Sequence, residues 1–150
     1  MRQGAYMKIK PLVENFIAPE RKNNSAGIDI FLQNDTTLQV GMDNIVGLGF
    51  ASEFPENQVA LLVPRSGTGI KGIHLRNTIG VIDADYRGEW IAHITVDEVG
   101  TNAWGNTMEF KRGDRLLQAI MVPIITDKPE IVEELSDTTR GDGGFGSTGE

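Results

Sequence analysis

Two aspartates that lie two residues apart are the first candidates for chemistry. Asp83 and Asp85 belong to the stretch NTIGVIDADYRGEW, residues 77–90. On a strand, this spacing places both carboxylates on one face. Two neighbouring carboxylates in a cleft could bind a metal ion or act as a general base. Read alone, however, the stretch is more typical of a solvated hairpin turn.

A second candidate is the segment PRSGTGIKG, residues 64–72, which follows a strongly apolar run. Arg65, Ser66 and Gly67 bring together a guanidinium, a hydroxyl and a bare backbone N–H, and these groups suit phosphate oxygens. An ordinary turn with a surface arginine explains the pattern equally well. The glycines of this segment also match the dinucleotide-binding fingerprint, but no helical pattern follows them, so we reject a dinucleotide site.

Asp29 and Gln118 are polar residues inside otherwise apolar, strand-like segments. Asp29 lies in AGIDIF, on the face opposite to that of its isoleucine neighbours. Such an acid usually points to solvent, but it could instead face a site and hold a metal ion through water. Gln118, in KRGDRLLQAIMVP, either lies on the solvent face or donates a directed hydrogen bond.

The chain ends in RGDGGFGSTGE, residues 140–150, which is too rich in glycine to form a core of its own. Phe145 is flanked by glycines, and such a ring suits stacking on a flat ligand. Arg140, Ser147 and Thr148 suit phosphate oxygens. The composition therefore suggests a flexible lid that becomes ordered over a nucleotide.

The 150 residues carry a net charge of −7 and include no cysteine. This length is typical of one domain. The negative charge argues against broad binding to nucleic acid or membranes, which favours basic surfaces. The absence of cysteine excludes disulfides, thiolate nucleophiles and cysteine-ligated metals. No apolar run reaches the ~18 residues of a membrane span and no signal peptide is recognisable, so we expect a cytoplasmic location.

Short apolar runs rich in Val, Ile and Thr, separated by Gly, Pro, Asn and Asp, predict an all-β barrel or sandwich. Residues 95–110 are expected to form a long hairpin, and residues 128–135 are expected to be extended rather than helical. The predicted divisions are residues 1–139, of which 1–6 could be an N-terminal extension, and the tail at 140–150. The expected strands are 26–31, 36–40, 45–51, 58–64, 88–96 and 115–125.

Five segments in order resemble the motifs of the trimeric dUTP pyrophosphatase (dUTPase) family: SAGIDIF, PRSGTGIKG, NTIGVIDADYRGEW, GDRLLQAI and RGDGGFGSTG. They span residues 25–149, and the third and fifth are highly specific. The short, cysteine-free form is similar to bacterial or phage members. The resemblance implies a β-barrel or distorted jelly roll with a flexible C-terminal tail. It also implies a homotrimer with shared active sites, each completed by the tail of a neighbouring subunit.

The resemblance also assigns a role to each matching residue. Asp83 is expected to be the general base that activates water, and Asp29 is expected to contact the water shell of the cofactor Mg²⁺. The expected contacts to uracil and deoxyribose are Asn77, Gly80, Val81, Ile82 and Tyr86, and Ile91 is included among the substrate-binding residues. Phosphate contacts are expected from Arg65, Ser66, Gly67, Gln118, Arg140, Gly146, Ser147 and Thr148, with Phe145 stacked on uracil.

The implied reaction is hydrolysis of dUTP to dUMP and pyrophosphate by in-line attack of water on the α-phosphate. It keeps uracil out of DNA and supplies dUMP for thymidylate synthesis. The alternatives are a dCTP deaminase and a regulatory protein that senses dUTP or binds another protein, for instance through the hairpin at 97–109. A purely structural β-barrel does not explain a glycine-rich tail with Arg140 and Phe145.

Overall fold

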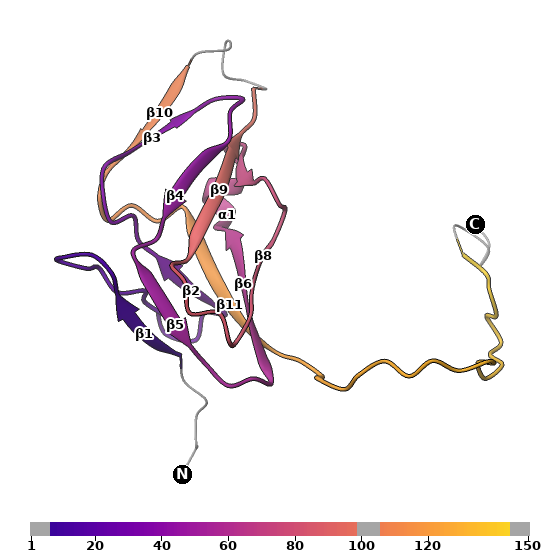
Figure 1. Ribbon diagram of the computed structural model, residues 1–150. Coiled ribbons are helices and arrows are strands. Elements are labelled where there is room, and N and C mark those ends of the chain that lie inside the picture. Colours follow the sequence, from indigo (N-terminus) through magenta and orange to yellow (C-terminus); the bar gives the residue numbers. More distant parts are fainter. Residues whose placement is uncertain (1–6, 99–105, 145–150) are drawn as a thin grey trace.

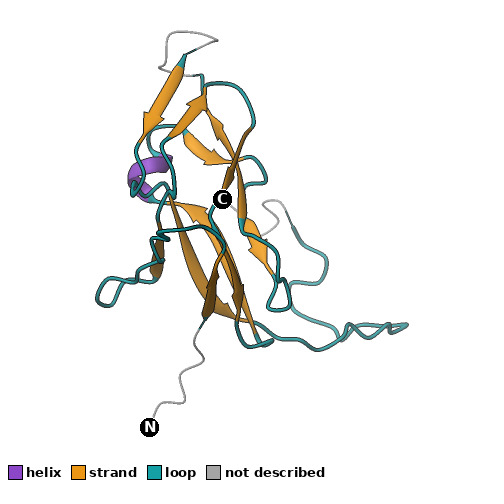
Figure 2. Ribbon diagram, turned by 60° about the vertical axis from the view of Figure 1, so that its left-hand side comes forward, coloured by secondary structure: helices purple, strands orange, loops and turns teal. Residues whose placement is uncertain are grey.

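The computed structural model describes residues 7–98 and 106–144, which form eleven strands and one short helix (Figures 1 and 2). The elements are β1 (Lys8–Pro11), β2 (Gly27–Ile30), β3 (Thr36–Gln39), β4 (Asn44–Gly47), β5 (Phe50–Glu53), β6 (Gln58–Pro64), α1 (Ser66–Gly69), β7 (Ile73–Leu75), β8 (Gly80–Ile82), β9 (Ile91–Val96), β10 (Thr107–Phe110) and β11 (Leu117–Pro123). The predicted all-β fold is confirmed. No helix in the described ranges is long and apolar enough to cross a membrane.

The strands pair in antiparallel fashion in four sheets. The largest sheet has the order β2–β11–β6–β8, and the second has the order β4–β9–β7. Two further pairs, β1–β5 and β10–β3, flank them (Figure 1). Neighbours in each sheet are far apart in sequence, so the fold brings the separated motifs together.

The two-residue period of β9 shows how the sequence builds the barrel. Ala92, Ile94 and Val96 are fully buried in the core, whereas Ile91 and His93 are exposed on the other face. This alternation is the expected signature of a strand with one buried face. The outward face of β9 therefore presents Ile91 and His93 at the protein surface.

Trp90 and Phe50 anchor the core just before β9 and at the start of β5. Both are completely buried, and their ring centroids lie 4.9 Å apart. The indole Nε1–H of Trp90 donates a 3.0 Å hydrogen bond to the hydroxyl of Ser52, so its polar atom is satisfied. The packing holds the segment before β9 firmly in place.

Three details of the sequence prediction are wrong or incomplete. The expected strand 45–51 is split into β4 and β5, because Gly49 adopts a φ of 77° and turns the chain. The expected hairpin 95–110 does not form as predicted, since β10 pairs with β3 while β9 pairs with β4 and β7. The sequence analysis also missed β1, β7, β8 and α1.

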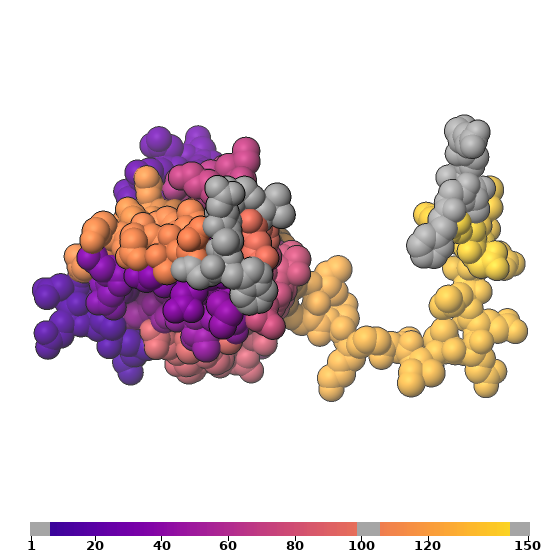
Figure 3. All heavy atoms as spheres, turned by 90° about the horizontal axis from the view of Figure 1, so that it is seen from above, coloured from indigo at the N-terminus to yellow at the C-terminus, as the bar shows by residue number. Residues whose placement is uncertain are grey.

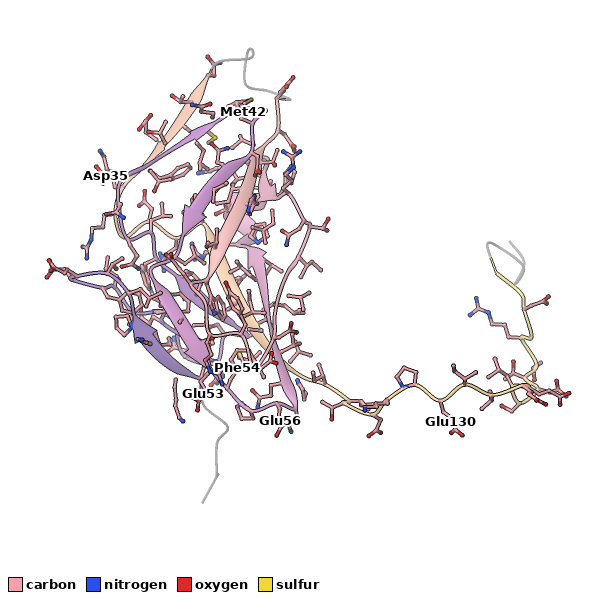
Figure 4. The ribbon with its side chains drawn as sticks, in the orientation of Figure 1. Asp35, Met42, Glu53, Phe54, Glu56 and Glu130 are labelled. Carbon is pink, nitrogen blue, oxygen red and sulfur yellow. The ribbon has the colours of Figure 1, made fainter. Side chains whose placement is uncertain are left out.

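After β11 the chain leaves the barrel as an arm, which we define as residues 124–144. Residues 128–135 contain no helix, as expected, and the arm extends well away from the barrel (Figures 1 and 3). Glu130 is labelled on the arm in Figure 4. Three large apolar residues of the arm, Ile125, Ile131 and Leu135, are 88%, 99% and 87% exposed. Such exposure of large apolar side chains indicates a surface that needs a partner.

Candidate active site

A tight turn between β7 and β8 shapes the first part of the site. The N–H of Thr78 donates to Leu75 at 2.9 Å, and the N–H of Ile79 donates to Asn77 at 2.7 Å. Thr78 has a φ of 69°, an unusual value for a β-branched residue. Gly80 then lets β8 approach β6, because a Cβ at this position would lie 2.9 Å from the Cβ of Leu62.

A cavity of about 260 Å³ opens between this turn and β9. The structure thus brings together the residues that were expected to hold the nucleoside and the general base. Those predicted residues are Asn77, Gly80, Val81, Ile82, Asp83, Tyr86 and Ile91. The remaining lining residues are Leu62, Leu75, Glu89, Ala92 and His93. We call this cavity the β8 pocket.

Asp83 directly follows β8, and its side chain is exposed to solvent at the β8 pocket. Its carbonyl accepts a 3.1 Å hydrogen bond from the N–H of Tyr86, which closes the turn. The Tyr86 hydroxyl donates to the carbonyl of Glu89 at 3.0 Å, and the ring lies against Gly88. Asp85 is also exposed, but it does not line the pocket. The structure therefore separates the two aspartates.

A second group of predicted residues meets where β2, β6 and β11 lie side by side. Asp29 on β2 is the register partner of Gln118 on β11. The Asp29 carboxylate lies 2.9 Å from Arg65 Nε through Oδ1 and 2.9 Å from Arg115 Nη1 through Oδ2. Its side chain is only 14% exposed. One carboxylate thus orients two guanidinium groups, which leaves a net positive charge for an anion.

Gln118 and the residues after β6 complete this arginine cluster. The Gln118 amide donates to the carbonyl of Pro64 at 3.3 Å. Ser66 and Gly67 begin α1 and are exposed. A Cβ at Gly67 would meet nothing within 4 Å, so its backbone is open to a ligand. A second cavity of about 440 Å³ is lined in part by Arg65, Gly67, Thr68, Lys71 and Arg115.

The β8 pocket and the arginine cluster are separate within one chain. No residue lines both cavities. Hence the predicted general base, Asp83, and the predicted phosphate contact, Arg65, do not face a common cavity in the described chain.

The predicted residues of the tail lie on or beyond the arm. Arg140 donates from Nε to the carbonyl of Gly143 at 2.8 Å, within the arm itself. Phe145, Gly146, Ser147 and Thr148 lie outside the described residues. The tip of the hairpin expected at 97–109 falls largely outside them as well.

The carboxylates of the described residues do not form a direct binding site for Mg²⁺. In residues 7–98 and 106–144 no group of three or more His, Asp or Glu is arranged to hold a metal ion. The Asp29 carboxylate already has a guanidinium on each oxygen. Magnesium commonly keeps several waters and is bound through substrate phosphates. The cluster therefore suits an ion that arrives with a phosphate chain better than one held directly by the Asp29 carboxylate.

An all-β chain with a nucleoside-sized pocket and a separate arginine cluster defines the class of a nucleotide-binding protein. The sequence matches the dUTPase family over residues 14–149, and the chain belongs to that family. The predicted family is thereby confirmed, and with it the enzyme class, hydrolases acting on dUTP.

Two relatives are named deoxyuridine 5′-triphosphate nucleotidohydrolase. The one from Nautilia profundicola is 37% identical over 145 residues, covering 95% of this chain and 98% of its own length. The one from Clostridium tetani is 38% identical over 145 residues, covering 95% and 96%.

Solved structures give the same result. The dUTPase of Staphylococcus bacteriophage 80alpha, with dUPNHPP, superposes with a TM-score of 0.81 at 29% identity, over 97% of this chain and 99% of that one. A mutant dUTPase of phage phi11 of S. aureus gives a TM-score of 0.75 at 28% identity over 86% and 97%, and is described as coordinating a structural Mg(II) ion. The jelly-roll-like fold is thus confirmed.

Sequence reasoning missed two polar residues of the β8 pocket, Glu89 and His93. The Glu89 carboxylate accepts the N–H of Gly49 at 3.0 Å, which ties the pocket wall to the turn before β5. His93 stands two residues after Ile91 on β9, so both lie on one face of the strand. That spacing was visible in the sequence and could have identified His93.

Proposed function

We propose that this chain hydrolyses dUTP to dUMP and pyrophosphate, with Asp83 as the general base that activates water for in-line attack on the α-phosphorus. The observation that carries the proposal is the β8 pocket, which gathers Asn77, Asp83 and Tyr86 around one nucleoside-sized space. General-base catalysis of this kind contributes about 10²–10⁴-fold to the rate. In the cell, this activity keeps uracil out of DNA and supplies dUMP for thymidylate synthesis.

Selectivity for uracil follows from the narrow β8 turn. The close approach of Gly80 to Leu62 leaves β8 little freedom to move outward. A 5-methyl group on the base is then rejected by steric overlap. Cytosine presents a donor where uracil presents an acceptor, and each buried group left unpaired costs about 1–3 kcal/mol. Tyr86 packs under the deoxyribose and leaves no room for a 2′-hydroxyl.

The arginine cluster holds the phosphate chain. Arg65, Ser66, Gly67 and Gln118 contact the phosphate oxygens, and Asp29 fixes the guanidinium of Arg65 at 2.9 Å. The protein has a net charge of −7, so local positive charge is required to bind a triphosphate. Mg²⁺, when present, would supply further positive charge against the pyrophosphate leaving group, and Asp29 would contact its water shell.

The separation of the two cavities supports active sites that are shared between the subunits of a homotrimer. The barrel contributes the β8 pocket of one subunit and the arginine cluster of another. The tail, residues 140–150, closes the site with Arg140 and Ser147 on the phosphates. The exposed apolar side chains of the arm support this exchange, because they need a neighbouring surface. The enzyme acts in the cytoplasm, which for a phage-encoded protein is that of the host.

The test is hydrolysis of dUTP, dTTP, dCTP and UTP in separate reactions with Mg²⁺, followed by phosphorus NMR. Pyrophosphate and dUMP from dUTP alone are expected. Orthophosphate, or turnover of all four nucleotides, contradicts the proposal. Release of ammonia from dCTP identifies a deaminase instead.

A further inference from the structure

His93 is a polar residue of the β8 pocket to which neither the motifs nor the proposed mechanism gives a role. It lies on β9 beside Ile91, and its side chain is 48% exposed. Its Nδ1 lies 2.9 Å from Oδ2 of Asp43. Asp43 immediately precedes β4, which pairs with β9 through Ile45 and His93. The two strands therefore hold the carboxylate and the imidazole side by side.

The contact with Asp43 fixes which ring nitrogen carries a proton. A carboxylate only accepts hydrogen bonds, so Nδ1 of His93 must be the donor. The neutral ring then has a free lone pair on Nε2, and Nε2 has no hydrogen-bond partner among residues 7–98 and 106–144. The hydrogen bond to the carboxylate thus sets both the tautomer and the orientation of the ring.

His74 offers an internal comparison. It also pairs with an aspartate, because its Nε2 lies 2.7 Å from Oδ1 of Asp97. Yet His74 does not line the β8 pocket, and the nitrogen it uses is the opposite one. A pair of histidine and aspartate is therefore not itself the signal. The signal is an oriented imidazole at the wall of the nucleoside cavity.

The two acidic side chains of the β8 pocket do not provide a neutral hydrogen-bond acceptor, whereas the His93 imidazole can. Glu89 is engaged by the N–H of Gly49, and Asp83 is assigned to water. Both are carboxylates, and a carboxylate repels a polyanionic substrate unless the substrate donates a hydrogen bond to it. An imidazole that accepts through Nε2 binds an N–H or O–H group without adding negative charge.

We propose that His93 is a substrate-binding residue of the β8 pocket and that Asp43 is its positioning residue. Nε2 accepts a hydrogen bond from a donor of the bound nucleoside, which is either the 3′-hydroxyl or the imide N–H of uracil. This inference rests on the proposed function, since it takes dUTP as the occupant of the pocket.

The direct test is nitrogen NMR of the two imidazoles in the intact protein, at a pH where histidine is neutral. The chain has only two histidines, so His74→Gln assigns both sets of signals. Saturation with the non-hydrolysable α,β-imido analogue of dUTP is expected to shift Nε2 of His93 and to leave His74 unchanged. An unchanged Nε2 signal of His93 at saturation, or equal shifts of both rings, overturns the proposal.

Steady-state kinetics provide the second readout. His93→Phe keeps a ring but removes the acceptor, so KM for dUTP should rise roughly three- to tenfold with kcat nearly unchanged. His93→Gln, which retains a polar group, should restore part of the loss. Asp43→Ala should raise KM as well, and combining it with His93→Phe should add nothing further. The matched control, His74→Phe, should keep the wild-type KM.

The triphosphate of 2′,3′-dideoxyuridine distinguishes the two possible donors. If the 3′-hydroxyl is the donor, wild type and His93→Phe should have the same KM for this analogue. If the imide is the donor, the difference between them should persist. A wild-type KM of His93→Phe for dUTP, or loss of its native oligomeric state, overturns the binding role. Failure of both wild type and His74→Phe to hydrolyse dUTP contradicts the proposed function instead.

Discussion

Oδ1 of Asp29 lies 2.9 Å from Nε of Arg65, and this ion pair joins the second strand to the end of the sixth. The other carboxylate oxygen holds Arg115 at the same distance. Neither arginine can be moved without disturbing the other, because one partly buried carboxylate serves both. The orientation of the proposed phosphate contacts therefore depends on an acid that need not touch the phosphates.

Replacing Asp29 with Asn is expected to lower kcat/KM for dUTP by roughly 10–100-fold, since the amide cannot fix both guanidinium groups. Steady-state kinetics with Mg²⁺ give the measurement. Glu53→Gln is the control, because Glu53 forms an exposed ion pair with Lys8 on β1, and such pairs contribute little. Equal activity of Asp29→Asn and wild type would show that the cluster does not orient the substrate.

Asp83 and Asp85 form a matched pair for testing the general base. Asp83 lines the β8 pocket and Asp85 does not, although both are exposed. Asp83→Asn is expected to lower kcat by about 10²–10⁴-fold and to retain binding of the imido analogue. Asp85→Asn should keep most of the activity. Calorimetric titration and turnover measure the two quantities, and wild-type turnover of Asp83→Asn rules out the assignment.

Removal of residues 140–150 tests the proposed lid. We expect kcat to fall by on the order of 10²-fold or more, because the phosphates lose their positioning contacts, while the proposed trimer persists. Sedimentation and turnover are measured on the same sample. Removal of residues 1–6 should change neither. Loss of assembly in the shorter chain would instead make the tail a structural element.

The sequence revealed the fold class through its local patterns, and the nucleoside side of the site through the resemblance of one stretch to a family motif. Val- and Ile-rich runs predicted the strands, and the specific stretch around Asp83 supplied most of the β8 pocket. The pairing of the strands was harder to predict from the sequence. The segment Thr107–Phe110 pairs with β3 rather than β9, and nothing in its own residues encodes that choice of a distant partner.

Contacts that need a register could not be predicted either. Asp43 meets His93 only because β4 pairs with β9 in one particular alignment. The ion pairs of Asp29 with Arg65 and Arg115 likewise form only because β2, β6 and β11 lie side by side. The helix α1 has four residues, which is too short for a 3.6-residue period to be visible. The contacts of Asp43 and Asp29 depend on how distant strands align, so no local pattern in the sequence predicts them.

Gly80→Ala tests whether close packing of β8 on β6 shapes the pocket. An added Cβ would lie 2.9 Å from that of Leu62, so the strand must shift. We expect a loss of about 1–3 kcal/mol in the free energy of unfolding and a higher KM for dUTP. Urea denaturation and kinetics measure the two effects. Gly69→Ala is the control, since its nearest contact would be 3.9 Å away at Pro64, and an equal loss there would contradict the packing argument.

Asp35 connects the start of β3 to the turn before β11, on the side of the barrel away from the arm (Figure 4). Its carboxylate accepts the N–H of Arg112 at 2.9 Å and the ammonium of Lys111 at 3.0 Å. The backbone bond from Arg112, followed by the Lys111 contact, lowers the pKa of Asp35 below its ordinary 3.8. The same pair raises the pKa of Lys111 above its ordinary 10.5, chiefly through its hydrogen bond to Asp35.

The two shifts fix the pH window in which this contact stabilises the fold. The contribution of Asp35 to the free energy of unfolding is present above the ordinary pKa of the carboxyl and is lost as pH falls through the lowered pKa. The contribution of Lys111 is present below the ordinary pKa of the amine and is lost as pH rises through the raised pKa. Asp35→Asn should therefore lower Tm by a similar small amount from about pH 5 to 9, and the difference from wild type should shrink in stronger acid. Thermal unfolding followed by circular dichroism measures it. Asp137→Asn, on the exposed arm, should leave Tm unchanged, and a Tm difference for Asp35→Asn that persists undiminished in strong acid would mean that the carboxylate charge is not its source.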